Sequence, residues 1–300
     1  WQPKPSKSSW EDPPKKLSVA VFSSWIYCMA SRAPSAISNP TNLLNQNNSD
    51  SPSPKTMSFN LIVDQGNSAC KVAFVRNNGI ESISFLQGKA GQALSHLVAP
   101  HRFDKAIYSS VGLPDEEAEA IVRSCAAASL MMGTETPVPL RLQYDRRTLG
   151  ADRLAAVVGA HSLYPNTELL VIDAGTAITY ERVSAEGIYL GGNISPGLHL
   201  RFKALHLFTG RLPLIDPSGI SPKIAEYGSS TEEAITAGVI HGLAGEIDRY
   251  IDDLHAKEGR SAVILTGGDA NYLARIIRSG ILIHPDLVLL GLNRILEYNV

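Results

Sequence analysis

Short apolar runs separated by polar, glycine-containing loops are the first regular pattern along the chain. Residues 59–63 (Phe-Asn-Leu-Ile-Val) end at Asp64, residues 71–75 follow a polar loop, and residues 80–85 come after an Asn-Asn-Gly turn. Apolar runs of this length, joined through a loop that contains glycine, predict adjacent strands of a hairpin. The order differs from the strand-then-helix order of a Rossmann unit.

The same pattern returns about a hundred residues later, an interval the size of a domain rather than of a solenoid repeat. An apolar run at residues 169–172 ends at Asp173, and residues 177–183 and 187–190 predict its partner strands. Each cycle thus ends its first strand with Asp-x-Gly. We therefore predict α/β architecture with two similar domains that face each other across a cleft.

Amphipathic stretches between these runs predict helices. Residues 115–132 have acidic residues in their first turn and Gly133 just beyond their end, so we expect a helix over this whole range. Residues 231–255 predict a long helix with an apolar stripe. A late apolar run, residues 261–265, leads into Thr266-Gly-Gly-Asp269, where small residues would let a nucleoside lie against the backbone.

The composition changes near Met57. Residues 1–56 hold all three tryptophans and 8 of the 18 prolines, and they end in a segment rich in Ser, Pro and Asn. Such a segment buries too little apolar surface to offset its ordering entropy. We expect a disordered leader or extension over residues 1–56, a first domain over residues 57–168 and a second over residues 169–300. Residues 17–30 resemble the apolar part of a signal peptide but are too short to span a membrane.

Charge and cysteine content reduce the number of function classes that fit this chain. The chain has 27 basic and 29 acidic residues, a net charge of −2, so we expect neither a nucleic-acid partner nor a membrane surface. Its 3 cysteines have no close spacing, which predicts neither a disulfide framework nor a zinc motif. A reducing, cytoplasmic location fits best.

The loop after the first run has the residue types that hold a phosphate. A glycine lets the backbone approach an anion and turn its N–H groups toward it, while amide and hydroxyl side chains add neutral donors. Asp64 can hold Mg²⁺ directly or through water. A plain β-turn would use the same residue types, so this motif alone leaves both readings open. The residues that we expect at a nucleotide's phosphates are Asp64, Gln65, Gly66, Asn67, Ser68 and Lys71.

The second loop, Asp173-Ala-Gly-Thr-Ala177, repeats this chemistry. One loop from each domain could hold a polyphosphate from two sides, with Thr176 donating to phosphate and Asp173 binding a cation. The chain contains no Gly-x-x-x-x-Gly-Lys-[Ser/Thr] segment and no Gly-x-Gly-x-x-Gly fingerprint, which disfavours P-loop and dinucleotide enzymes.

Gly150-Ala-Asp-Arg153 combines a carboxylate with a guanidinium at the start of a helical stretch. Asp152 could accept the proton of an alcohol while Arg153 orients an acidic substrate. The alternative is that Asp152 is only a helix N-cap, a common position for aspartate.

Together these motifs resemble those of type III pantothenate kinases. That family belongs to the acetate and sugar kinase, Hsp70 and actin superfamily, whose fold is a pair of ribonuclease-H-like domains. The resemblance covers Met57 to the C-terminus. The segments that carry it, in the family's order, are Asp64-Gln-Gly-Asn-Ser68, Gly150-Ala-Asp-Arg153, Asp173-Ala-Gly-Thr-Ala177, Gly191-Gly-Asn-Ile-Ser-Pro-Gly-Leu198, Thr209-Gly-Arg-Leu-Pro213 and Ser230-Thr-Glu-Glu-Ala-Ile235.

The resemblance implies ATP-dependent phosphorylation of pantothenate, the first step of coenzyme A synthesis. It implies that residues 64–71 and Thr176 bind ATP with Mg²⁺, and that Asp173 binds a monovalent cation, K⁺ or NH₄⁺. Asp152 would be the base. It also implies a homodimer, which the apolar stripe of residues 231–255 would support unless that stripe packs inside its own domain. The residues implied to hold pantothenate are Tyr144, Gly150, Ala151, Asp152, Arg153 and Thr231.

The sequence departs from the family's pattern in two places. Tyr144 is one residue closer to Gly150 than in the family, and Arg146-Arg147 replace the usual proline between them. The first loop ends in Ser68 where threonine is typical, which keeps the hydroxyl. The alternatives are an ATP-binding regulatory or accessory protein of the same fold, another small-molecule kinase of the superfamily, and an exported binding protein.

Overall fold

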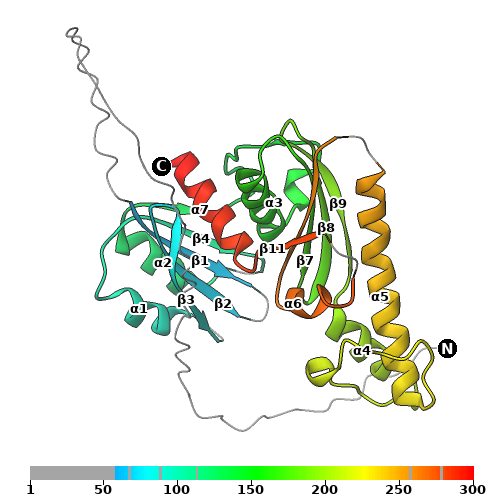
Figure 1. Ribbon diagram of the computed structural model, residues 1–300. Helices are drawn as coiled ribbons and strands as arrows, with labels where there is room; N and C mark the ends of the chain where they lie inside the picture. The colour runs from blue at the N-terminus through cyan, green and yellow to red at the C-terminus, as the bar shows by residue number, and fades with distance from the viewer. Residues whose placement is uncertain (1–57, 67–68, 88–89, 113, 257–258, 278–279) are drawn as a thin grey trace, which may run out of the picture. The chain divides into compact units, whose positions relative to one another are not determined.

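Two sheets with a shared strand order organise the described part of the chain, shown in the computed structural model of Figure 1. The structure describes residues 58–66, 69–87, 90–112, 114–256, 259–277 and 280–300. The predictions for residues 1–56, and for Asn67 and Ser68, lie outside these ranges.

The first sheet has the strand order β3-β2-β1-β4-β5. Its first three strands are antiparallel, while β4 and β5 run parallel to β1. Asn77 and Asn78 have φ angles of 50° and 64°, the left-handed conformation that a tight hairpin turn needs, so the predicted hairpin is confirmed. The strands are β1 (Phe59–Gln65), β2 (Cys70–Arg76), β3 (Gly79–Leu86), β4 (Phe103–Ser110) and β5 (Ala126–Met131).

The second sheet repeats this order as β9-β8-β7-β10-β11 and adds β6 beside β9. Again the first three strands are antiparallel and the last two run parallel to the first. The repeat confirms the prediction of two similar α/β halves. The strands are β6 (Arg141–Leu142), β7 (Glu168–Ala174), β8 (Ala177–Val183), β9 (Ile188–Pro196), β10 (Ser261–Thr266) and β11 (Ile281–Ile283).

Helices cover the sheets in layers. α1 (Gly91–Val98) and α2 (Glu116–Cys125) pack on one face of the first sheet, and α3 (Ala151–Leu163) and α7 (Leu287–Asn299) lie between the two sheets (Figure 1). α5 (Thr231–His255) covers the far face of the second sheet. The shorter helices are η1 (Arg146–Thr148), α4 (Leu198–Leu207), η2 (Pro217–Gly219) and α6 (Ala270–Leu273).

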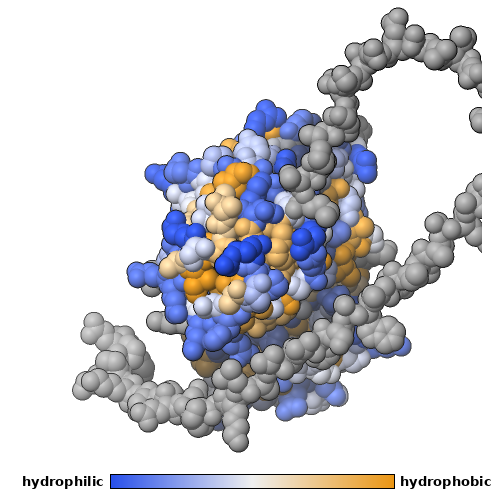
Figure 2. All heavy atoms as spheres, turned by 90° about the vertical axis from the view of Figure 1, so that its left-hand side faces the viewer, coloured by the Kyte–Doolittle hydropathy of each residue, from blue (hydrophilic) through white to orange (hydrophobic). Residues whose placement is uncertain are grey.

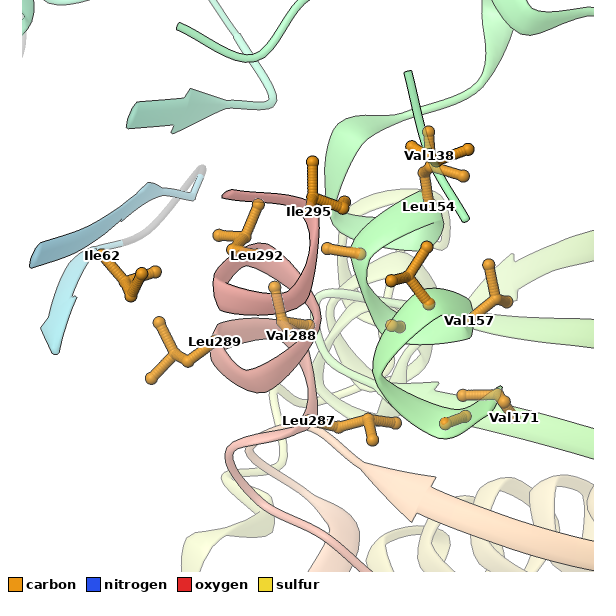
Figure 3. Close-up of a cluster of buried hydrophobic side chains, with 14 of the residues drawn as sticks. Ile62, Val138, Leu154, Val157, Val171, Leu287, Val288, Leu289, Leu292 and Ile295 are labelled. Atoms are coloured by element: carbon orange, nitrogen blue, oxygen red, sulfur yellow. The ribbon is translucent and has the colours of Figure 1, made fainter. Parts of the chain in front are cut away.

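Alternation along β7 explains these layers. Leu169 and Val171 point into the cluster of α3 and α7, whereas Leu170 and Ile172 point into the cluster of α5. Figure 3 shows the first cluster, in which Ile62 of the first sheet faces Leu289 and Leu292 of α7. A strand apolar on both faces is therefore what a sheet covered by helices on both sides requires.

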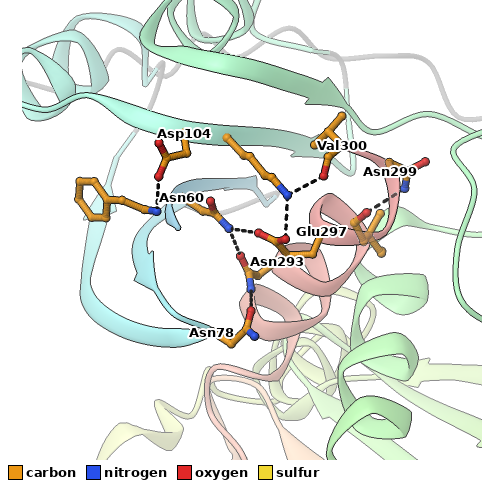
Figure 4. Close-up of polar contacts among 10 residues, drawn as sticks. Asn60, Asn78, Asp104, Asn293, Glu297, Asn299 and Val300 are labelled. Atoms are coloured by element: carbon orange, nitrogen blue, oxygen red, sulfur yellow. Dashed lines mark hydrogen bonds and ion pairs between the residues drawn. The ribbon is translucent and has the colours of Figure 1, made fainter. Parts of the chain in front are cut away.

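Polar contacts also tie α7 to the first sheet (Figure 4). The Asn60 side-chain amide donates to Asn293 Oδ1 at 2.9 Å and to Glu297 Oε1 at 2.7 Å. Lys105 Nζ donates to Glu297 at 2.8 Å and to the Val300 carbonyl at 2.6 Å. The C-terminal helix thus belongs to the packing of both halves. β6, which precedes residue 168, already belongs to the second sheet. The boundary between residues 168 and 169 stays a prediction.

The helix predicted over residues 115–132 is wrong in its second half. α2 begins after Asp115, whose carboxylate accepts hydrogen bonds from the amides of Glu117 and Ala118, but it ends at Cys125. Residues 126–131 form β5, which pairs in parallel with β4. The apolar run suits a buried strand as well as a helix, and pairing with β4 decides between them.

The long helix over residues 231–255 is confirmed with the expected bounds. Its apolar stripe packs inside its own half, because Ile235, Val239, Ile240 and Leu243 are buried with β7 and β10 residues. The stripe therefore gives no support to a dimer. Among the residues that the structure describes, no helix combines the length and apolar composition needed to span a bilayer.

Candidate active site

The two Asp-x-Gly loops come together at the carboxyl ends of β1 and β7. Lys71 lowers the pKa of both Asp64 and Asp173, and Asp152 raises the pKa of both, so these four side chains share one electrostatic field. The structure thus brings together residues of both predicted loops and of the Gly150–Arg153 motif.

Asp64 is a buried carboxylate opposite a lysine. It is 7% exposed, and its Oδ1 atom has no hydrogen-bond partner in the described part of the chain. Burial raises the pKa of Asp64 to about 6, Lys71 opposes the shift, and Asp152 and Asp173 add to it. Lys71 pairs directly with Asp64 across β1 and β2, which puts both side chains on one face of the sheet.

Asp173 is in an electrostatic environment similar to that of Asp64, but its cross-strand partner is not a lysine. Burial raises its pKa to about 6, Lys71 opposes the shift, and Asp152 and Glu181 add to it. The residue directly across from Asp173 is Thr179 of β8, whose Oγ1 is buried without a hydrogen-bond partner. Gly267, at φ 94°, approaches so closely that an added Cβ would lie 2.5 Å from Asp173 Oδ1.

The described residues on either side of the first loop are joined by a hydrogen bond. The Gly66 amide donates to the Ala69 carbonyl at 3.0 Å. Gln65 has a buried Oε1 without a hydrogen-bond partner, and its Nε2 donates to the Gly66 carbonyl at 3.4 Å. In the second loop Thr176 is exposed, and its carbonyl accepts from the Gly197 amide at 3.1 Å.

Asp152 lies in the first turn of α3 rather than at its N-cap. The N-cap residue is Gly150, which provides no side-chain hydrogen bond. The Asp152 carboxylate accepts from the Arg153 amide at 2.8 Å and folds back over Gly150, where an added Cβ would lie 2.5 Å from Asp152 Oδ1. The N-cap interpretation of Asp152 is therefore wrong, and a side chain at residue 150 would displace the Asp152 carboxylate from this position.

Arg153 is buried and its charge is already matched. Its Nε and Nη2 donate to Glu181 at 2.6 and 2.9 Å, and Nη2 also donates to the Tyr189 hydroxyl at 3.1 Å. Burial lowers the pKa of Arg153. The hydrogen bonds and the charge of Glu181 raise the pKa by a larger amount, so the net shift is upward. Nη1 donates to the Tyr144 hydroxyl at 3.4 Å, which joins these two predicted substrate residues.

A cavity of about 260 Å³ opens beside this motif. Its wall combines the ends of β4 and β5 with η1 and the start of α3, and it includes Gly150 and Ala151 of the predicted substrate segment. The residues that line it are Ser110, Val111, Met132, Gly133, Thr134, Arg146, Arg147, Thr148, Leu149, Gly150, Ala151 and Leu154.

Thr231 lies apart from this cavity. It is exposed at the first residue of α5, and none of the cavity's lining residues comes from α5. Since α3 and α5 pack on opposite faces of the second sheet, the sheet separates Thr231 from the Gly150 motif of the same chain.

Two residues at the site are absent from the sequence-based prediction. Glu181 shares a strand face with Val183, which is buried, so strand alternation alone would have indicated a core glutamate that needs a cation. Asp286 sits before α7, where burial raises its pKa and Lys71 lowers it. Nothing in the sequence near Asp286 brings it toward Lys71, because the link depends on how α7 returns between the sheets.

The shared strand order and the convergent aspartates define a duplicated α/β fold in which each half contributes an aspartate from an Asp-x-Gly loop to one site. A solved structure from Campylobacter jejuni, described as a Baf family transcriptional activator, superposes with a TM-score of 0.53 at 22% identity, over 80% of this chain and 98% of that one. At this identity the likeness speaks for the fold alone.

Sequence comparison identifies the family within that class. A family model for type III pantothenate kinases matches residues 60–253. A type III pantothenate kinase of Porphyromonas gingivalis is 99% identical over 244 residues, which is 81% of this chain and 100% of the relative. One of Bacteroides fragilis is 42% identical over 242 residues, 80% of this chain and 98% of the relative. The chain belongs to the type III pantothenate kinase family.

Proposed function

We propose that this chain transfers the γ-phosphoryl group of ATP to the primary hydroxyl of pantothenate, giving 4'-phosphopantothenate and ADP for coenzyme A synthesis. The observation that carries the proposal is the convergence of Asp64, Asp152 and Asp173 around Lys71 in a member of this family. Phosphoryl transfer depends mainly on positioning and charge stabilisation, which this arrangement can supply.

The nucleotide's phosphates would lie between the two loops. Gly66 and Lys71 serve them from the first half and Thr176 from the second. Asp64 fits a magnesium ion, because its buried Oδ1 has no hydrogen-bond partner among the described residues and carboxylate oxygen is a preferred Mg²⁺ ligand. When bound, Mg²⁺ neutralises charge on the phosphate oxygens. The fully ionised carboxylate that binds it best is favoured above pH 6, given the raised pKa of Asp64.

A monovalent cation at Asp173 completes the charge balance. Asp173 and the buried Thr179 Oγ1 that faces it have oxygen atoms that suit K⁺, or accept hydrogen bonds from NH₄⁺. Two carboxylates with raised pKa values would otherwise repel the phosphates of ATP. The cation therefore supplies positive charge that the second half lacks.

Asp152 is the base. Its carboxylate lies beside Gly150, which lines the cavity that would hold pantothenate. As the substrate oxygen bonds to the γ-phosphorus, the bond to the bridging oxygen of ADP breaks, and the hydroxyl proton passes to an Asp152 oxygen. Arg153, held by Glu181, keeps Tyr144 against the same site.

A homodimer would reconcile the predicted role of Thr231 with its position in the structure. Thr231 is expected at pantothenate yet lies across the second sheet from Gly150 in its own chain. A second copy could bring its Thr231 to this cavity. Exposed apolar side chains near α5 suit such an interface, namely Leu207, Phe208, Leu214 and Tyr227, of which Phe208 is 87% exposed. By contrast, hydrophilic residues interrupt the apolar patches on the face beside α1 and α2 (Figure 2).

Mixed dimers test this shared site. Asp152→Asn and Thr231→Ala subunits, each impaired alone, would combine into a dimer in which one site has both native residues. We expect activity at low pantothenate concentration to recover on mixing. No recovery, with mixed dimers confirmed by mass spectrometry, would contradict a site shared between copies.

Product analysis tests the reaction itself. The chain is incubated with Mg·ATP, K⁺ and a panel of pantothenate, acetate and hexoses, and the products are followed by phosphorus NMR and coupled ADP detection. We expect ADP and phosphopantothenate in equal amounts and no phosphorylation of the other compounds. ATP binding without turnover of any of them would favour the regulatory alternative instead. A cytoplasmic location accords with the supply of ATP that the reaction needs.

A further inference from the structure

The cavity beside Gly150 has a cationic wall. Among the described residues that line it, Arg146 and Arg147 are the ionisable ones, and no carboxylate side chain is present. Both arginines lie between Tyr144 and the Gly150–Arg153 motif, next to the predicted substrate residues. A cationic side chain on the wall that no described carboxylate neutralises would favour an anion inside the cavity.

The two arginines differ in how their charge is matched. Arg147 Nε and Nη2 donate to the Asp145 carboxylate at 3.1 and 2.9 Å, and the Arg147 side chain is 81% exposed. Arg146 is partly buried, and its Nε and Nη2 atoms are buried with no hydrogen-bond partner among the described residues. A buried guanidinium edge without an acceptor is costly, which indicates that a ligand supplies the acceptor.

The Nε–Nη2 edge of arginine matches the two oxygens of a carboxylate. The other arginine of the motif, Arg153, already has that kind of partner in Glu181. Pantothenate has its reacting hydroxyl at one end and a carboxylate at the other. With the hydroxyl at Asp152, the carboxylate end needs a cation elsewhere on the wall.

We propose that Arg146 binds the carboxylate of the acid substrate through its Nε and Nη2 atoms and so makes this enzyme select the free acid. The inference rests on the proposed function, since it concerns how the same substrate is held. Arg146 is a binding residue here and takes no part in the proton transfer.

Paired kinetics with pantothenate and with its neutral primary amide tests the inference. Arg146→Gln removes the charge but keeps a polar side chain, and we expect KM for pantothenate to rise about 10- to 100-fold, the range for a lost charge-assisted hydrogen bond. The kcat with pantothenate should change less than about threefold, because Asp152 is untouched. KM for the amide should be nearly unchanged, so the preference for the acid collapses.

Arg146→Lys and Arg147→Gln are the comparison variants. Arg146→Lys keeps the charge without the planar edge and should give an intermediate KM, which preserves the test if Arg146→Gln folds poorly. Arg147→Gln makes the same charge change one residue along, where Asp145 already neutralises the guanidinium, and should raise KM less than about threefold.

Three results would overturn the inference. They are an unchanged KM for pantothenate in Arg146→Gln, an equal rise of KM for acid and amide, and a larger effect in Arg147→Gln than in Arg146→Gln. Calorimetric titration of the nucleotide-free protein with pantothenate should give the same ranking. Failure of the proposed function would differ, because the parent itself would then turn over neither compound.

Discussion

The two halves of the molecule have one strand order but treat their aspartates differently. In the first half Asp64 ends β1 and faces Lys71 of β2. In the second half Asp173 ends β7, and the corresponding position of β8 holds Thr179. Burial raises both aspartate pKa values to about 6. The two carboxylates therefore have similar pKa values, although their cross-strand partners differ.

This difference assigns separate tasks to the halves. The first half pairs its aspartate with an ammonium group, whereas the hydroxyl opposite Asp173 is buried with no hydrogen-bond partner among the described residues. Lys71 also acts on Asp173 and Asp286, so one lysine serves several carboxylates. In the proposed function, a cation from solution would add the positive charge that the second half does not itself place opposite Asp173.

The largest expected effect is at Asp152, which belongs to neither loop. Asp152→Asn is nearly isosteric, and removal of a general base costs about 10²–10⁴-fold in rate. We expect kcat to fall by that factor, while the melting temperature and the ATP affinity stay close to those of the parent. Steady-state kinetics, calorimetry and nucleotide titration measure the three quantities. A kcat within a few-fold of the parent would remove Asp152 from the reaction.

The next effect tests the lysine of the first half. Lys71→Met removes the ammonium group and should raise KM for ATP about 10- to 100-fold, the range for a lost charge-assisted hydrogen bond. The acidic limb of the pH–rate profile should move to higher pH, because Lys71 normally lowers the pKa of Asp64 and Asp173. Lys203→Met, the same change at an exposed lysine of α4, is the control. Equal behaviour of both variants would contradict the role of Lys71.

The amino-acid sequence predicts the parts of this site that follow from the repeat. A hairpin after each apolar run fixes which residue faces which, so the hairpin pattern itself pairs Asp64 with Lys71. The equivalence of Asp64 and Asp173 follows from the same reasoning. The roles of the individual site residues stay predictions, which the variants at these positions test.

The features that the sequence does not predict depend on contacts between segments that are distant along the chain. The Arg153–Glu181 pair joins a helix to a strand, and the orientation of Arg153 changes what it can bind. The sequence alone favours helix over residues 126–131, because an apolar run fits either structure until β4 pairs with it. Likewise, periodicity predicts the stripe of α5 but not the surface that it covers.

A smaller effect is expected from a substitution that gives the second half the same pairing as the first. Thr179→Lys puts an ammonium group opposite Asp173, as Lys71 stands opposite Asp64. We expect this variant to lose most of its activation by K⁺ or NH₄⁺ while it keeps activity in their absence. Asp173→Asn should also lose the activation, but with a lower rate throughout. Assays in sodium-free buffers with graded KCl measure both.

Asp64→Asn is the contrast for that experiment. It removes a carboxylate of the first half, so it should weaken dependence on Mg²⁺ and leave the shape of the K⁺ response unchanged. If instead Asp64→Asn abolished the K⁺ response and Asp173→Asn did not, the assignment of the two cations to the two halves would be reversed.

The smallest effect is on stability, and it should be the same in both halves. A buried aspartate whose pKa rises from about 3.8 unfolded to about 6 folded binds its proton more tightly in the folded state. The free energy of unfolding therefore falls as pH rises from about 4 to 6, and above pH 6 each group costs up to about 3 kcal/mol. Below pH 4 both states hold the proton, and the cost vanishes.

Asparagine at either position removes this free-energy cost. We therefore expect the two aspartates to destabilise the nucleotide-free protein. At pH 7.5 we expect Asp64→Asn or Asp173→Asn to melt above the parent by up to about 6–12 °C, at about 2–4 °C per kcal/mol. At pH 4 the difference should disappear. The double variant should gain less than the sum, because Asp173 raises the pKa of Asp64 and either single change already relieves that repulsion. Calorimetry across this pH range without nucleotide decides it. A variant that melts below the parent at pH 7.5 would mean that these carboxylates serve folding rather than the cations and phosphates of the site.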